Sequence, residues 1–135
     1  MYYSLSLLAT SFIIGFILFQ VGLNTSVIFT KLNPENASVV LRSIFPRFFM
    51  SIFSFSLISF VSLLLASIDG LVFYISIATI LLSGACYFII PATNNARDNG
   101  NDRLFSVYHN LSVFSTLTML VINLISFFSY HVFIG

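Results

Sequence analysis

The sequence predicts an all-α fold: an integral membrane four-helix bundle with both termini on the outer side of the membrane. Three observations predict it. Charged residues make up only 7% of the chain, whereas hydrophobic residues make up 59%. Four apolar stretches are long enough to cross a bilayer. All the basic residues lie in or beside the two connections that a four-span topology places on one side.

The composition excludes an ordinary soluble domain. About a quarter of the residues in such a domain are charged, whereas this chain of 135 residues has five basic and four acidic ones. Its outer surface must therefore be largely apolar, which suits lipid. The net charge of +1, from separated basic residues, excludes the basic patch that nucleic-acid binding requires. Cys86 is the single cysteine, which excludes an internal disulfide.

Four spans follow from the apolar stretches, since a membrane-crossing helix needs about 20 mainly apolar residues. We place the spans at 4–29, 48–68, 71–90 and 104–134, in a single transmembrane domain over 1–135. The first stretch lacks the basic start and the small-residue cleavage site of a signal peptide. We therefore expect it to be retained as a span.

The connection between the first two spans contains a helix start signal. Asn33 can cap a helix that begins with Pro34, and Glu35 in its first turn suits the positive end of the helix dipole. Partly apolar turns follow, and Pro46 is placed to start or kink the second span. We predict a short interfacial helix here, between helices 1 and 2, lying on the membrane surface.

The connection between the third and fourth spans is rich in turn-forming residues, and Asp102 is placed to cap the fourth span. The connection between the second and third spans offers only Asp69 and Gly70. Basic residues in short loops mark the cytoplasmic side. We therefore expect loops 30–47 and 91–103 on the cytoplasmic side of a bacterial inner membrane or its organellar equivalent.

Polar side chains inside the spans need partners, because unpaired polar groups are costly in lipid. Gln20 and Asn24 are four residues apart and so lie on one helix face. Asn123 continues a polar stripe on the fourth span. For these three amides, interhelical hydrogen bonding is favoured over ligand binding, and for the small hydroxyl residues helix packing is favoured.

His109 lies one to two turns into the fourth span, near the basic face. It could titrate near neutral pH, ligate a metal or haem, or hydrogen-bond Asn94, Asp98 or Gln20. His131 cannot join it on one haem, because it comes 22 residues later, about 33 Å along the same helix. We predict no metal site and no cofactor, with haem or metal ligation by His109 as an alternative.

Two sequence elements resemble a known family. The run Ile44-Phe45-Pro46-Arg47-Phe48-Phe49 is similar to a hydrophobic-Phe-Pro-x-aromatic-Phe element of the transmembrane protein 205-like family. A second element resembles that family's Pro…Arg-Asp…Arg-Phe…His-x-x-Ser pattern, with Pro91, Arg97, Asp98, Arg103, His109 and Ser112 at the matching positions and Leu104 in place of the aromatic residue directly after Arg103. The resemblance implies a bacterial-type four-helix membrane domain of undefined function.

The polar residues near the predicted cytoplasmic helix ends define a candidate ligand site. We expect it to contain Arg47, Asn94, Arg97, Asp98, Arg103 and His109, with Gln20 and Asn24 just above them. Two of these, Arg97 and Arg103, suit an anionic group such as a lipid phosphate or a carboxylate, and Asp98 would orient one arginine. The alternative is a structural clamp of ion pairs between helix ends.

The favoured function is a non-enzymatic membrane protein whose polar cluster binds a lipid or a small anionic ligand, and no catalytic residue is predicted. One alternative is an accessory membrane subunit of a larger complex. Another is a haem- or metal-binding redox protein that uses His109. The expected partners are membrane lipids and either a larger membrane complex or further copies of the chain, with no nucleic acid.

Overall fold

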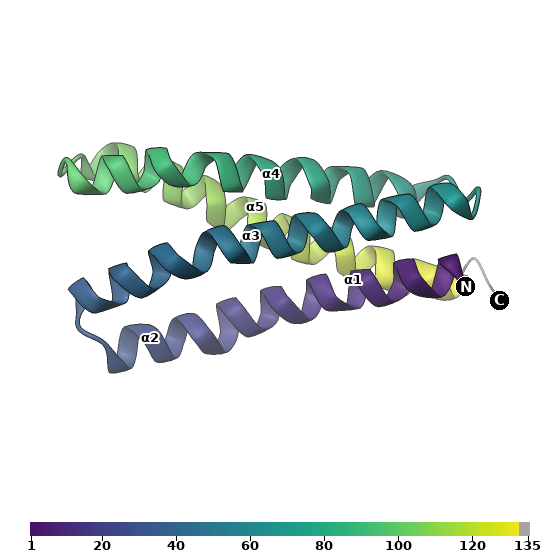
Figure 1. The fold of residues 1–135 in the computed structure, drawn as a ribbon, viewed down its shortest axis with the longest axis horizontal. Helices are drawn as coiled ribbons and strands as arrows, with labels where there is room; N and C mark the ends of the chain where they lie inside the picture. The colour runs from purple at the N-terminus through teal and green to yellow at the C-terminus, as the bar shows by residue number, and fades with distance from the viewer. Residues whose placement is uncertain (133–135) are drawn as a thin grey trace.

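The computed structural model describes the fold of residues 1–132, and all its secondary structure is helical (Figure 1). The first rod consists of α1 (Tyr2–Leu18), a π-helical turn η1 (Phe19–Asn24) and α2 (Thr25–Lys31). The remaining helices are α3 (Pro34–Leu65), α4 (Leu71–Asp98) and α5 (Asp102–Val132). Within the described residues, four segments are long and apolar enough to cross a membrane: Tyr2–Lys31, Pro34–Leu65, Leu71–Asp98 and Asp102–Tyr130. The all-α fold with four such helices is thus confirmed, while the last predicted span, 104–134, extends beyond the described residues.

The helices pack in a ring: α3 lies between α1 and α4, and α5 lies between α4 and α1. Consecutive helices run in opposite directions (Figure 1). The α2–α3 and α4–α5 connections share one end, which we call the basic end because it carries all the basic residues: Lys31, Arg42, Arg47, Arg97 and Arg103. The opposite end, with Met1 and the α3–α4 turn, is the terminal end. Which side of the membrane each end faces stays a prediction.

The first turns of α3 belong to the same helix as the second span, so the structure has no separate short helix before Pro46. Asn33 caps α3 as predicted, since its side-chain oxygen accepts a hydrogen bond from the Asn36 N–H at 2.8 Å. Inside the helix, Pro46 removes the one hydrogen bond that an N–H there would give to the carbonyl of Arg42. The position of these turns relative to the membrane surface stays a prediction.

Packing on both sides of Pro46 explains why the helix continues. Before the proline, Ala37 and Leu41 are buried against Ile28 of α2. After it, Phe48 and Phe49 are buried in the main core, where they meet residues of α1, α4 and α5. These contacts favour one continuous helix and offset the single lost hydrogen bond.

Buried polar contacts close the terminal end of the bundle. The Ser6 hydroxyl lies 2.7 Å from that of Ser59 and also hydrogen-bonds the Tyr130 hydroxyl. The Tyr3 hydroxyl donates to the backbone carbonyl of Tyr130 at 2.6 Å. These bonds tie α1, α3 and α5 together. Nearer the middle, Asn123 of α5 donates to the Thr79 hydroxyl of α4 at 2.9 Å, which confirms the interhelical hydrogen bond predicted for this asparagine.

The α4–α5 turn differs from the prediction in its capping residue. The side-chain oxygen of Asn101 accepts a hydrogen bond from the Leu104 N–H at 3.1 Å. Asp102 is therefore the first residue of α5 and not its cap. Its carboxylate still suits the positive end of the helix dipole.

Candidate functional site

A cavity of about 320 Å³ lies at the basic end, between the η1–α2 rod, α3, α4 and α5. Four of the eight predicted site residues line it: Gln20, Asn94, Arg97 and His109. Arg42, which the sequence did not assign to the site, lines it as well. Most of the remaining wall is apolar, and includes Phe29, Phe45, Phe48, Phe49, Ile90 and Leu117. The cavity is therefore amphipathic.

The π-helical turn positions Gln20. The Thr25 N–H reaches the carbonyl of Gln20, five residues back, and the Thr25 hydroxyl donates to the same carbonyl at 2.8 Å. Asn24 donates from its side-chain amide to the Gln20 side-chain oxygen at 2.7 Å, which agrees with the predicted common face. The hydrogen bonds of these two side chains lie within the first rod and not between helices, as had been predicted. Gln20 is buried and lines the cavity, whereas Asn24 supports it from outside the lining.

Phe105 joins two of the polar residues in the cavity wall. The guanidinium carbon of Arg97 lies over the Phe105 ring, 5.0 Å from its centre. The His109 imidazole stacks on the same phenyl ring, with centres 5.6 Å apart and planes 13° from parallel. The contact between Arg97 and the Phe105 ring is a cation–π interaction. It places the guanidinium at the cavity without neutralising its charge.

Asp98 pairs with Arg42 and not with the arginines that the sequence suggested. The Arg42 Nη1 donates to Asp98 Oδ2 at 3.1 Å, and Nη2 donates to Oδ1. The Arg42 Nε is buried and has no hydrogen-bond partner among the described residues. The hydrogen bonding of Arg42 at the cavity wall is therefore incomplete, and leaving a buried N–H without a partner costs free energy.

Arg47 and Arg103 lie outside the cavity lining. The Arg47 Nη1 donates to the Ser43 hydroxyl at 2.7 Å and to the Ser43 carbonyl at 3.1 Å, both within its own helix. Arg47 comes five residues after Arg42, so its side chain leaves α3 in a direction about 140° away from that of Arg42. Arg103 is exposed in the first turn of α5. The structure thus does not bring all the predicted arginines together.

His109 gains no metal-ligating neighbours in the described part of the chain, where no group of three or more His, Cys, Asp or Glu side chains could hold a metal ion. Nor does any described residue hydrogen-bond its imidazole; the contacts predicted with Asn94, Asp98 or Gln20 do not form. Haem ligation by His109 stays a prediction. The charged side chains that line the cavity are those of Arg42 and Arg97.

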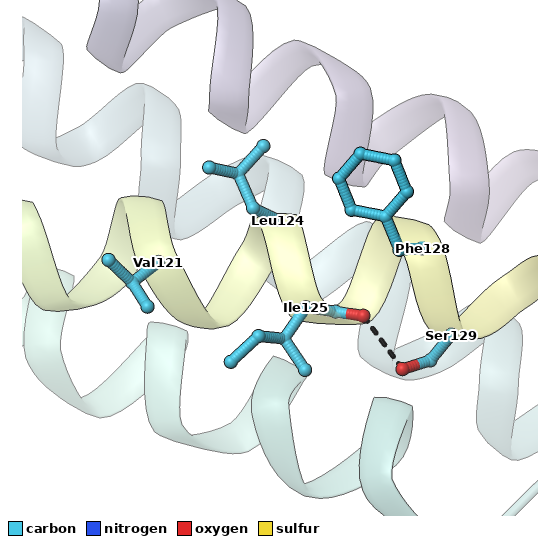
Figure 2. A pocket seen from close by; sticks show the side chains of 5 residues that line it. All are labelled: Val121, Leu124, Ile125, Phe128 and Ser129. Carbon is cyan, nitrogen blue, oxygen red and sulfur yellow. Dashed lines mark hydrogen bonds between the residues drawn. The ribbon is translucent and has the colours of Figure 1, made fainter.

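A second hollow lies on the outer face of α5, lined by Val121, Leu124, Ile125, Phe128 and Ser129 (Figure 2). Figure 2 shows these side chains on one helix, with the Ser129 hydroxyl donating to the Ile125 carbonyl. That bond, 2.7 Å long, occupies the single polar side chain of the hollow. Its apolar wall suits contact with lipid chains, so the cavity at the basic end is the candidate site.

Four long apolar helices, with rings such as Phe88 and Phe114 largely exposed on the outside and hydroxyl and amide groups paired inside, define an integral membrane protein. The chain belongs to the family described as Domain of unknown function (DUF4149), whose sequence model matches residues 8–102. The match includes Arg97 and Asp98 and ends at the first residue of α5, before His109. Comparisons with curated proteins and with solved structures give no match.

Proposed function

We propose that this membrane protein is non-enzymatic and binds an anionic group in the cavity at the basic end. Arg97 carries the proposal. Its guanidinium is held on Phe105 at the cavity wall and has no ion-pair partner within 4.0 Å among the described residues. A guanidinium offers a planar fork of N–H donors that matches a phosphate or a carboxylate.

The charges around the cavity support an anion over a cation. Asp98 forms an ion pair with Arg42, whereas Arg97 interacts with this carboxylate only through space. The side-chain amides of Gln20 and Asn94 add neutral hydrogen-bonding groups to the same wall.

A thermal unfolding assay with glycerol phosphate tests the proposal, with glycerol as the uncharged control ligand. We expect glycerol phosphate to stabilise the wild-type protein, and Arg97→Gln to weaken that binding about tenfold. Arg47→Gln is the matched control, because it removes the same charge from the same end but outside the cavity lining. If Arg97→Gln and Arg47→Gln weaken binding equally, the cavity is not the anion site.

The basic end is proposed to face the cytoplasm, in a bacterial inner membrane or its organellar equivalent, because basic residues gather there. The resemblance to the transmembrane protein 205-like family stays a prediction, because the family model that matches is described as a domain of unknown function.

Two alternative functions stay predictions. An accessory subunit would cover exposed rings such as Phe88 and Phe114 with a larger partner, and gentle extraction followed by sizing would then recover a large complex. A redox protein using His109 would show the Soret absorption of haem after purification. A small particle in the sizing measurement argues against the accessory subunit. The absence of Soret absorption argues against the haem protein.

A further inference from the structure

We infer that the ligand is a membrane lipid with an anionic headgroup, which enters the cavity sideways from the bilayer through a gap between α2 and α5. The inference rests on the proposed anion site and adds the ligand class and the route. The route follows from the way in which the two halves of the first rod pack.

The first rod contacts α5 only along α1. No Cα atom of η1 or α2 lies within 8 Å of one in α5, and α2 packs against α3 instead. In Figure 1, the rod and α5 lie together near the terminal end and separate toward the basic end. The cavity is nevertheless lined from both sides of this separation, by Val21 and Phe29 on the rod and by Val113 and Leu117 on α5. It therefore extends into the gap.

Beyond the exposed His109 near the start of α5, the edges of the gap are apolar and exposed. On the rod, Val21 is 51% exposed and Phe29 is 62% exposed; on α5, Val113 is 42% exposed and Leu117 is 44% exposed. A route for a water-soluble anion would have polar edges, because the ion keeps its hydration until it reaches the site. Apolar edges within spanning helices favour a hydrocarbon chain.

The depth of the gap matches a lipid in one leaflet. Arg97 is next to the last residue of α4, at the level expected for a headgroup. Val113 follows the start of α5 by eleven residues, about 16 Å along the helix, which is about half of a hydrocarbon core of about 30 Å. A chain that runs from Arg97 along the gap would therefore stay in one leaflet.

The size of the cavity also favours a partly enclosed lipid. A volume of about 320 Å³ is at the lower end for sites that enclose a drug-sized ligand. It holds a headgroup and the first part of a chain, and leaves the rest of the lipid in the gap. The basic end, with its five basic residues against the acidic Glu35, Asp98 and Asp102, favours an anionic lipid there.

Quenching of tryptophan fluorescence by brominated lipid chains tests the inference in phosphatidylcholine vesicles. The chain has no tryptophan, so Phe29→Trp gives one reporter at the gap. Phe128→Trp gives the matched reporter, because Phe128 is exposed and lies in the last turns of α5. A minority of the vesicle lipid is brominated phosphatidylglycerol, which is anionic, or brominated phosphatidylcholine, which has no net charge.

At Phe29→Trp, we expect phosphatidylglycerol to associate about fivefold more strongly than phosphatidylcholine, and at Phe128→Trp we expect no difference. Adding Arg97→Gln should remove the preference at Phe29→Trp, whereas adding Arg47→Gln should keep it. Val113→Trp repeats the measurement from the other edge of the gap, in case Phe29→Trp disturbs folding.

Equal quenching by the two lipids at both edges of the gap overturns the inference, and so does a preference that survives Arg97→Gln. If the gap shows no preference while glycerol phosphate still stabilises the wild type through Arg97, the lipid inference fails and the anion site stands. If the gap shows no lipid preference and glycerol phosphate does not stabilise the wild type, both the lipid inference and the proposed anion site fail. A preference of equal size at Phe128→Trp would show general attraction to the protein surface and would also overturn the inference.

Discussion

Arg42 of α3 and Asp98 of α4 form a two-pronged ion pair beside the candidate anion site. The pair joins two helices across 56 positions of sequence. Both side chains are partly exposed, at 34% and 57%, so solvent screens the pair and its contribution to stability is small. The pair offsets the charge of Arg42 directly, whereas Arg97 interacts with the same carboxylate through space and without an ion pair.

Removing the carboxylate should therefore strengthen anion binding. We expect Asp98→Asn to raise the affinity for glycerol phosphate roughly a few-fold, because the Arg42 charge is no longer balanced. Adding Arg42→Gln should reverse the gain. The measurement is the ligand-dependent shift in thermal unfolding. Asp102→Asn is the control, since it removes an acidic group from the same end that makes no ion pair with a residue of the cavity lining, and an equal gain in it would contradict the prediction.

The sequence did not predict that Arg42 lines the cavity, because a helix start or kink was expected at Pro46. A single helix places Ser38, Leu41, Arg42, Phe45 and Phe49 on one face, as their spacing of three to four residues requires. That spacing is visible in the sequence once the helix is allowed to run through the proline. The sequence alone offered no reason to do so, because the compensating contacts with α1, α2, α4 and α5 are tertiary.

The start of α3, the π-helical turn and the Arg97–Phe105 contact differ in how far neighbouring residues in the sequence determine them. The start of α3 was predictable, because Asn33 and Pro34 act on their own backbone. The π-helical turn was not, since a bond over five residues has no sequence signature comparable to a cap. The stacking of Arg97 on Phe105 depends on how α4 and α5 meet, which the spacing of residues within one helix does not determine.

Cysteine labelling should establish which end faces the cytoplasm. We expect a membrane-impermeant maleimide to label Asp69→Cys on intact cells, and to label Asn99→Cys only after permeabilisation, since basic connections stay inside. Both positions are exposed, at opposite ends of the bundle. The native Cys86 is buried and stays silent, so the wild-type protein is the control. Labelling of Asn99→Cys on intact cells would reverse the assignment.

The hydrogen bond between Asn123 and Thr79 should contribute modestly to stability. Both residues are buried, and the asparagine also donates to the Met119 carbonyl. A double-mutant cycle with Asn123→Ala and Thr79→Val should give a coupling energy of about 0.6 kcal/mol, and no more than about 1.7 kcal/mol, as for other hydrogen bonds between membrane helices. The measurement is the free energy of unfolding in detergent.

The control for this cycle is Thr30→Val, which removes an exposed hydroxyl that bonds only to carbonyls of its own helix. It should show no coupling to Asn123→Ala. A coupling near zero for the Thr79→Val cycle would mean that packing alone joins α4 and α5 at this point.

The π-helical turn should matter for binding and not for folding. It holds one residue more than an α-helical turn, and Gly22 is exposed with no heavy atom within 4 Å of the position a Cβ would take. Deleting Gly22 should restore regular helical bonding and leave Ile17 and Ile28, which are buried on either side, on their present faces. We expect unchanged helical content and an equal or higher unfolding temperature.

Binding of glycerol phosphate should fall several-fold in the same variant, because Gln20 loses the geometry that the wide turn gives it. Deleting Gly15 is the control: it lies in regular α-helix, so its loss rotates the preceding residues of α1 by about 100°. That deletion should take Ile13 off the core and destabilise the protein. If deleting Gly22 is as damaging to folding as deleting Gly15, the π-helical turn is part of the fold; if it leaves binding unchanged, Gln20 has no part in the anion site.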